Sequence, residues 1–263
     1  MPKERLCSLA AGTILDVGPA DAPGLARASG WDAVGIWFDA ATWTERTTAA
    51  VNAALREHEV IALDVEPVIL GPDGDPGDAL IDAAIALGAR NVLVASRLPP
   101  SSEVIARYGA LCDRAAAGSE SLRVVLEFLP IFGVRTLADA LQVVRAADRP
   151  NGGVLVDTLH LARSGGSPDD VRAAPRQLFP YLQLADAPAV APDDSLRGLT
   201  HEALHGRLLP GHGALPLRAT LDALPDVSVS VELRSATLMH DHPDPVKRAK
   251  ALLSATRLVV NAS

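Results

Sequence analysis

The sequence contains only two cysteines, Cys7 and Cys112, which lie far apart in a chain of 263 residues. This separation fits neither the paired spacing of a zinc knuckle nor the dense framework of a small disulfide-rich domain. We therefore expect a reduced, cytoplasmic protein without a structural disulfide or a cysteine-bound metal.

The chain also lacks a long hydrophobic run and an excess of positive charge. No segment reaches the roughly 18 consecutive apolar residues of a membrane helix, and the apolar stretch in MPKERLCSLAAG is too short for a signal peptide. Lysine and arginine number 24 against 32 aspartates and glutamates, which gives a net charge of −8. This balance argues against nucleic acid and membranes as partners and favours a small-molecule substrate.

Glycine-rich phosphate loops are missing as well, since neither GxGxxG nor GxxxxGK[ST] follows an early strand. Instead, short runs rich in Val, Ile and Leu alternate with longer segments of helical period, as in a parallel sheet covered by helices. The predicted strands are residues 6–10, 33–38, 60–66, 91–96, 123–128, 153–158, 181–186 and 227–233. Eight such units predict an α/β fold, a single (β/α)8 TIM barrel domain over residues 1–263.

Helices are predicted between these strands, and several begin with Ser, Thr, Asp or Pro, the residues preferred at helix N-termini. One connection, residues 187–213, is unusually long, and in a barrel such a loop is usually functional. His201 and His205 stand at helical spacing within it, which would suit a metal pair, although a lid over the site is the stronger expectation.

Four polar residues occur at the ends of four consecutive predicted strands. They are Glu127, Asp157, Gln183 and Glu232. Strand ends build one face of a TIM barrel, so these side chains should converge, and three carboxylates in an apolar barrel need a cation between them. Oxygen donors suit Mn²⁺ or Mg²⁺, with Zn²⁺ as an alternative. Any one of these acids alone would serve equally well as a helix cap or an arginine partner.

The ordered set resembles the xylose-isomerase-like TIM barrel superfamily, in the sugar phosphate isomerase/epimerase branch that includes ketose 3-epimerases, hydroxypyruvate isomerases and inosose dehydratases. The resemblance covers essentially the whole chain. It implies one divalent metal ion per chain, held by Glu127, Asp157, Gln183 and Glu232. The family's DxxH motif corresponds to DTLH, so that His160 binds substrate, and its RxxPGxG loop to RLLPGHG, so that Arg207 does the same.

The sequence departs from the family pattern in two places. His212 stands where related loops often carry an acid, and Gln183 replaces an imidazole that is common in ketose epimerases. The end of the fifth predicted strand, EFLPIFGV, is also apolar where a polyol binder would offer hydroxyl partners. A substrate less polar than a simple sugar fits this pattern.

The resemblance implies that Glu127 and Glu232 act as base and acid at a carbon next to a metal-bound carbonyl. The leading expectation is an isomerase or epimerase acting on a sugar, polyol ketone or small hydroxy-ketone. The alternative is a dehydratase or lyase of the inosose or dehydroshikimate dehydratase type, which shares the first step. A DNA-repair endonuclease would need more histidines and a cationic surface, and a non-catalytic barrel would not need the complete set of acids.

Other residues carry weaker expectations. Glu66 either binds substrate or pairs with Arg97, while Trp37 is expected to fill the barrel mouth rather than to stack on a substrate. His240 and His242 form an HxH pattern that usually lies in solvent. For His160 the alternative is a buried histidine bonded to a backbone carbonyl, and for Arg207 it is a solvated loop charge. The resemblance allows a homodimer or a homotetramer, and the sequence does not choose between them.

Overall fold

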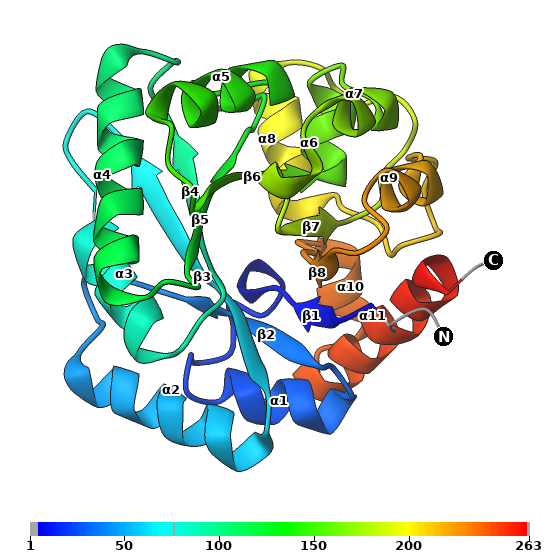
Figure 1. Ribbon diagram of the computed structural model, residues 1–263. Helices are drawn as coiled ribbons and strands as arrows, with labels where there is room; N and C mark the ends of the chain where they lie inside the picture. Colours follow the sequence, from blue (N-terminus) through cyan, green and yellow to red (C-terminus); the bar gives the residue numbers. More distant parts are fainter. Residues whose placement is uncertain (1–4, 76, 262–263) are drawn as a thin grey trace.

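Eight parallel strands close into a barrel in chain order in the computed structural model, which describes residues 5–75 and 77–261 (Figure 1). The strands are β1 (Cys7–Leu9), β2 (Ala33–Trp37), β3 (Ile61–Leu70), β4 (Asn91–Ser96), β5 (Arg123–Glu127), β6 (Gly152–Asp157), β7 (Tyr181–Leu184) and β8 (Ser228–Val231). The predicted (β/α)8 barrel is confirmed, and every predicted strand overlaps an observed one.

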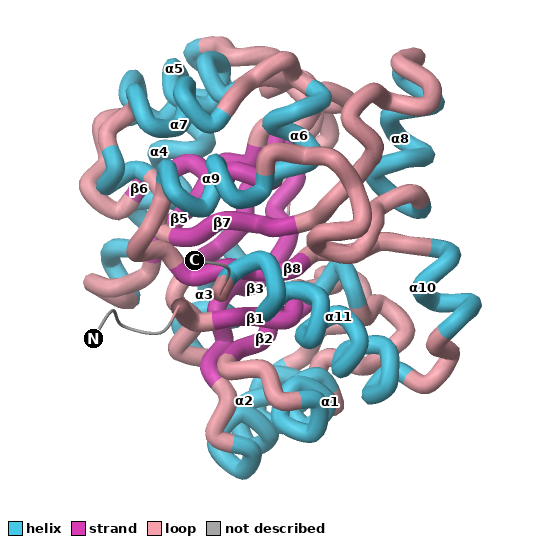
Figure 2. Tube along the Cα trace, turned by 90° about the vertical axis from the view of Figure 1, so that its right-hand side faces the viewer, coloured by secondary structure: helices cyan, strands magenta, loops and turns pink. Residues whose placement is uncertain are grey.

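Helices enclose this barrel, as Figure 2 shows. They are α1 (Ala22–Ser29), α2 (Glu45–His58), α3 (Gly77–Ala86), α4 (Ser102–Gly118), α5 (Leu137–Ala147), α6 (Thr158–Arg163), α7 (Pro168–Ala173), α8 (Leu196–His205), α9 (Leu217–Ala223), α10 (Ala236–Asp241) and α11 (Pro245–Val260), with short 3-10 turns at Ala11–Thr13 and Arg176–Leu178. None of the helices in the described part of the chain combines the length and hydrophobicity that crossing a bilayer requires.

Side-chain caps fix where several helices begin. The side chains of Thr44 and Thr136 each accept a hydrogen bond from the backbone nitrogen of the third residue of the helix they precede. In both cases that residue's side chain accepts a hydrogen bond from the backbone nitrogen of the threonine. Ser167 does the same before α7, with Pro168 at the first helical position. The chain therefore leaves β6, forms α6 and turns into α7 at a fixed point.

Strand β3 is longer than predicted, because it continues to Leu70 beyond the proline at position 67. A proline cannot donate to the sheet, and the pairing with β4 shifts register between Val65 and Val68 at that point. The Glu66–Pro67 peptide bond is cis. Glu66 consequently lies within β3 and not at its end.

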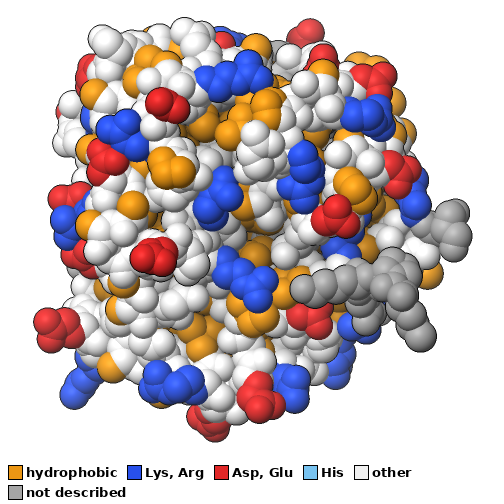
Figure 3. Space-filling view, viewed as in Figure 1, with side chains coloured by type: hydrophobic (Ala, Val, Ile, Leu, Met, Phe, Trp, Pro, Cys, Tyr) orange, Lys and Arg blue, Asp and Glu red, His pale blue; other side chains and the backbone are white. Residues whose placement is uncertain are grey.

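Buried side chains fill one layer of the barrel interior. It consists of Ala33, Leu63, Leu93, Val125, Leu155 and Tyr181, all buried. Because alternate residues of a strand face the same side, Glu127, Asp157 and Gln183, each two residues further along, project into the interior as well. On the outside, acidic and basic side chains are interspersed over the face seen in Figure 3.

Candidate metal and proton-transfer site

The ends of neighbouring strands bring the predicted site residues together. Glu127 ends β5, Asp157 ends β6, and Asp157 pairs in register with Gln183 on β7. Glu232 follows the last residue of β8 directly. Glu127, Asp157 and Gln183 are buried, and Glu232 is largely so. The convergence expected from the sequence is therefore present in the structure.

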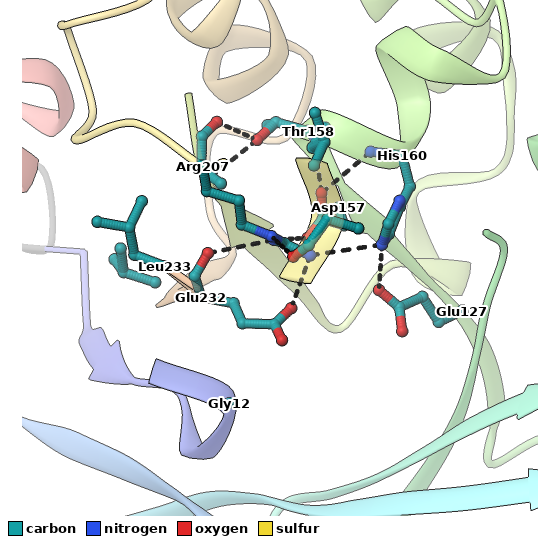
Figure 4. A network of polar contacts seen from close by, with 12 residues as sticks. Gly12, Glu127, Asp157, Thr158, His160, Arg207, Glu232 and Leu233 are labelled. Carbon is teal, nitrogen blue, oxygen red and sulfur yellow. Dashed lines mark hydrogen bonds and ion pairs between the residues drawn. The ribbon is translucent and has the colours of Figure 1, made fainter. Parts of the chain in front are cut away.

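Arg207 lies at the centre of this group and is only 2% exposed (Figure 4). One terminal nitrogen is 2.6 Å from Asp157 Oδ2, and the other is 3.2 Å from Glu232 Oε2. Its Nε donates to the carbonyl of Ala203 on α8. Burial disfavours the charged guanidinium, but Asp157 and Glu232 outweigh that cost and raise the pKa of Arg207. A solvated loop charge is thus ruled out for this residue.

Asp157 has two structural partners in addition to its place in the acid cluster. Its Oδ1 accepts hydrogen bonds from the backbone nitrogens of Leu159 and His160 and so caps α6, while Oδ2 takes Arg207. Burial acts to raise the pKa of Asp157, but Arg207 and His160 outweigh it and the pKa is lowered. Both simpler roles considered for this acid, helix cap and arginine partner, are therefore realised. Neither removes Asp157 from the metal set.

His160 is held next to Glu127 and Arg207. Its Nε2 lies 3.9 Å from Glu127 Oε1 and 3.4 Å from a terminal nitrogen of Arg207, so it faces these side chains and not a backbone carbonyl. Burial lowers the pKa of His160 to about 4, with Asp157 opposing and Arg207 adding to the effect. The imidazole is neutral at physiological pH, and Nε2 accepts from Arg207.

The donor set fits a divalent cation. Glu127, Asp157 and His160 offer ligand atoms that all lie within 4.8 Å of one another. Among the described residues, Glu127 Oε1 and both amide atoms of Gln183 have no hydrogen-bond partner although they are buried. Buried polar atoms are rarely left unpaired, so these donors are suited to a ligand. Glu232 lies outside the group of three and is engaged by Arg207.

Burial and neighbouring acids raise the pKa values of several carboxyl groups in this interior. Burial raises the pKa of Glu127 well above its ordinary value, and Glu232 and Asp157 add to the effect. The pKa of Glu66 is raised in the same way by burial, then by Asp64 and Glu232. That of Glu232 is raised by burial against the opposing charge of Arg207. Without an added cation, the ionised forms of these carboxyl groups are disfavoured.

A cavity of about 420 Å³ opens onto these residues. Its polar lining includes Glu66, Glu127, His160, Arg207 and Glu232. Its apolar lining includes Ile69, Leu129, Ile131, Phe132 and Leu204. Arg97 and Arg234 add positive charge, and the Arg97 guanidinium lies 5.7 Å from the centre of the Phe132 ring. Such a cavity suits a compact molecule that carries both polar and apolar groups.

Of the other residues singled out in the sequence, Glu66 and Trp37 line the cavity, whereas His240 and His242 do not. Glu66 accepts a hydrogen bond from the Gly12 nitrogen, and no ion pair joins it to Arg97 within the described chain. Trp37 lines the cavity and also an adjoining one of about 410 Å³, so it forms the wall between them. His240 is exposed and His242 half-buried on and after α10, away from the cavity lining.

The long connection after β7 covers the cavity in part. Helix α8 places Thr200, Ala203 and Leu204 in the cavity wall, while His201 and His205 face outward with their rings 5.2 Å apart. His212 is exposed, and the glycines on both sides of it donate their backbone nitrogens to Asp186. The PGHG segment is therefore a tight turn, and it does not bring His212 to the site.

Two interior residues were not anticipated from the sequence. The Tyr181 hydroxyl donates to Asp64 Oδ2 at 2.7 Å, across the barrel from β7 to β3. Burial raises the pKa of Asp64 to about 6, against the Tyr181 bond and with help from Glu232. The signal available was an aspartate in the otherwise apolar run IALDV, where only a buried partner explains a charged residue.

Comparison with known proteins agrees with this geometry. A family model described as xylose isomerase-like TIM barrel matches residues 23–257. Two curated relatives are 3-dehydroshikimate dehydratases. The one from Pseudomonas putida is 33% identical over 107 residues, which is 40% of this chain and 16% of the relative. The one from Pseudomonas aeruginosa is 28% identical over 159 residues, 58% of this chain and 24% of the relative. The chain thus matches less than a quarter of the length of either.

Solved structures share the fold over nearly all of the chain. The IolI protein, described with a bound zinc atom, superposes with a TM-score of 0.82 at 19% identity, covering 97% of this chain and 98% of the other. A D-psicose 3-epimerase solved in the presence of D-fructose gives 0.73 at 14% identity, with 98% and 100% covered. At these identities the likeness establishes the barrel.

Proposed function

The chain belongs to the xylose isomerase-like TIM barrel family, and on that premise we propose that it is a divalent-metal-dependent enzyme. Its reaction begins with removal of a proton from the carbon next to the carbonyl of a compact hydroxy-ketone. The observation that carries the proposal is the imbalance of buried charge. Asp64, Glu66, Glu127, Asp157 and Glu232 share one interior, where Arg207 pairs with Asp157 and Glu232. A divalent ion corrects that imbalance.

Glu127, Asp157, Gln183 and Glu232 would hold the metal, and His160 is close enough to join them or to contact substrate. Mn²⁺ or Mg²⁺ suits the oxygen donors, and the imidazole together with the zinc-bound IolI structure keeps Zn²⁺ as an alternative. When bound, the metal supplies polarisation of the substrate carbonyl and stabilises the negative charge that develops on its oxygen.

The protein's own groups divide the proton transfers. Glu232 is suited to act as the base, because its carboxylate borders the cavity and is paired with the Arg207 guanidinium. Glu127 lies beside His160 and lines the same cavity, so it is placed to deliver a proton to the substrate. Arg207 and His160 would hydrogen-bond the substrate oxygens and orient them.

The fate of the carbanion distinguishes two outcomes. In dehydration, the bond from the neighbouring carbon to its hydroxyl breaks, a carbon–carbon double bond forms, and the hydroxyl leaves as water with the proton from Glu127. In isomerisation or epimerisation, the proton returns to carbon instead. Two observations favour dehydration over the isomerase expected from the sequence. Both curated relatives are dehydratases, and the cavity pairs an apolar wall with Arg97 and Arg234.

These features also bear on the substrate. Guanidinium groups in the lining of a largely apolar cavity suit a compact ring that carries a carboxylate, as 3-dehydroshikimate does. A neutral polyol would leave Arg97 and Arg234 without a partner. We therefore place a carboxylated cyclic hydroxy-ketone ahead of a free sugar, with the ketose as the second candidate.

The test is incubation of the Mn²⁺-loaded protein in deuterium oxide with 3-dehydroshikimate, inososes and a panel of ketoses, followed by proton NMR. The proposal predicts loss of water from the carboxylated ring. Deuterium incorporation without water loss in a ketose would support epimerisation in its place. If no compound of the panel exchanges a carbon-bound proton, the proposed first step is contradicted for these substrate classes.

A further inference from the structure

Unpaired polar atoms lie inside the barrel beyond the proposed ligands. Ser8 Oγ, Asp64 Oδ1 and Ser230 Oγ have no hydrogen-bond partner among the described residues, and all three side chains are fully buried. Leaving a buried polar atom unpaired costs about 1–3 kcal/mol, so folded proteins pair such atoms with protein groups or with internal water. We call these three residues the serine–aspartate group.

Strand register places the two serines of this group on the strands next to Gln183. Ser8 pairs with Ser230 between β1 and β8, and Ser230 pairs with Gln183 between β8 and β7. Residues in register on neighbouring strands project to the same side, which here is the barrel interior. Tyr181 precedes Gln183 by two residues and reaches Asp64 across the barrel. Gln183 therefore lies in register between Asp157 on β6 and Ser230 on β8, while Asp64 faces the same interior from β3.

The carboxamide of Gln183 must be oriented before it can act as a ligand. Only its oxygen can coordinate a cation, whereas its nitrogen donates two hydrogen bonds. Both ends are buried, and neither has a hydrogen-bond partner in the part of the chain that the structure describes. A histidine at this position would also need a fixed ring orientation. A glutamine can turn either its oxygen or its nitrogen toward the cation, and the two orientations have similar shapes, but only the oxygen can coordinate.

The serine–aspartate group has the complementary chemistry. Ionised Asp64 only accepts hydrogen bonds, and each serine hydroxyl both accepts and donates. None of these atoms has a hydrogen-bond partner among the described residues, and internal water is the group that commonly pairs with such atoms. Internal water typically makes about three hydrogen bonds to such groups.

We propose that Ser8, Asp64 and Ser230 hold internal water that accepts hydrogen bonds from Gln183 Nε2 and so turns Gln183 Oε1 toward the divalent cation. The three residues are positioning residues, and they act on metal affinity through Gln183. The inference rests on the proposed function for the metal and on the register and burial for the water.

The first experiment measures Mn²⁺ affinity by calorimetry without substrate. Residues behind a metal ligand typically change affinity about 10–100-fold, and we expect a loss in that range for the Ser8→Ala/Ser230→Ala double variant. Ser96→Ala is the matched control, because Ser96 is also a buried strand serine but its hydroxyl is satisfied by the carbonyl of Leu98. The control should bind as the wild type does. Equal affinity for the double variant and the wild type overturns the inference.

A second comparison separates orientation from a general structural effect. In Gln183→Glu both terminal atoms are oxygens, so no orientation needs to be fixed. Adding Ser230→Ala to Gln183→Glu should leave Mn²⁺ affinity unchanged, although Ser230→Ala alone weakens it. An equal loss in both backgrounds would show that Ser230 acts on the fold and not on the amide.

A high-resolution crystal structure of the metal-free protein decides the water directly. The inference predicts ordered water in contact with Ser230, Asp64 and the Gln183 nitrogen. Direct side-chain contacts, or a sodium ion with short oxygen contacts, would contradict it. This readout also separates the two proposals, because a wild type that binds no divalent cation refutes the metal site while the water and the amide orientation are still observed.

Discussion

Arg207 and Asp157 form a buried ion pair. A guanidinium nitrogen lies 2.6 Å from Asp157 Oδ2, and the two side chains are 2% and 0% exposed. The pair joins the loop after α8 to the end of β6 and links the helix cap of α6 to the acid cluster. Arg207 thus supplies the positive charge that the acids need when no metal is bound.

Removal of Arg207 should destabilise the metal-free protein and matter less in the metal-bound form. Arg207→Met leaves Asp157 and Glu232 buried without a countercharge, a change that typically costs about 3–5 kcal/mol. Urea denaturation with EDTA and with Mn²⁺ measures the difference. Arg114→Met, which breaks the exposed pair with Asp82, is the control and should change stability little. An equal loss of stability with and without Mn²⁺ would contradict the idea that the bound metal replaces the positive charge of Arg207.

Asp64 should make the metal-free protein less stable at alkaline pH. Its pKa is about 6 in the fold against an ordinary 3.8, so the folded state holds a proton that the unfolded state releases between these values. This contribution lowers the free energy of unfolding as pH rises from about 4 to about 6. Asp64→Asn should therefore be more stable than the wild type at pH 8, by on the order of 2 kcal/mol, with a smaller gain at pH 4. A gain independent of pH would count against this interpretation.

Glu232→Gln should abolish turnover while the fold is kept. An amide cannot take a proton from carbon, and loss of a general base costs at least about 10²–10⁴-fold in rate. Initial rates with the substrate found by NMR, together with thermal unfolding, provide the measurement. Glu103→Gln on the exposed surface of α4 is the control. Near-normal turnover by Glu232→Gln would remove this residue from proton transfer.

Arg97 should set selectivity for a carboxylated substrate. Arg97→Met keeps apolar contact with Phe132 but removes the charge, so KM for an acidic substrate should rise about 10-fold or more, the loss expected for a hydrogen bond to a charged group. Arg135→Met, an exposed arginine outside the cavity lining, is the control. Neutral ketoses should be unaffected by either change. A KM for the acidic substrate that does not respond would argue for another recognition group.

The sequence predicted the barrel because the alternation of apolar strands and amphipathic helices is a local property. The same alternation placed Glu127, Asp157 and Gln183 at strand ends, where geometry alone makes them converge. The extent of β3 was not predictable in this way, because Pro67 is accommodated by an irregular pairing with β4 that depends on the neighbouring strand.

Contacts between distant segments were also beyond local patterns. Arg207 and Asp157 are 50 residues apart, and a loop arginine gives no sign that it will be buried. Tyr181 and Asp64 are 117 residues apart and meet only after the barrel closes. The carboxylate of Asp186 accepts hydrogen bonds from the PGHG turn, and its position at the end of a predicted strand gave no sign of that role. Each is a long-range pairing that satisfies a buried charge, and the fold decides the partner.

The most direct test of the central claim is metal binding by chelator-treated protein. Equilibrium dialysis against Mn²⁺, Mg²⁺ and Zn²⁺ should find about one divalent ion per chain for the wild type, and little for Glu127→Gln. At a free concentration of 100 times Kd, the ion should raise the free energy of unfolding of the wild type by about 2.7 kcal/mol. Absence of stoichiometric binding for all three ions, with no stabilisation, would contradict the account.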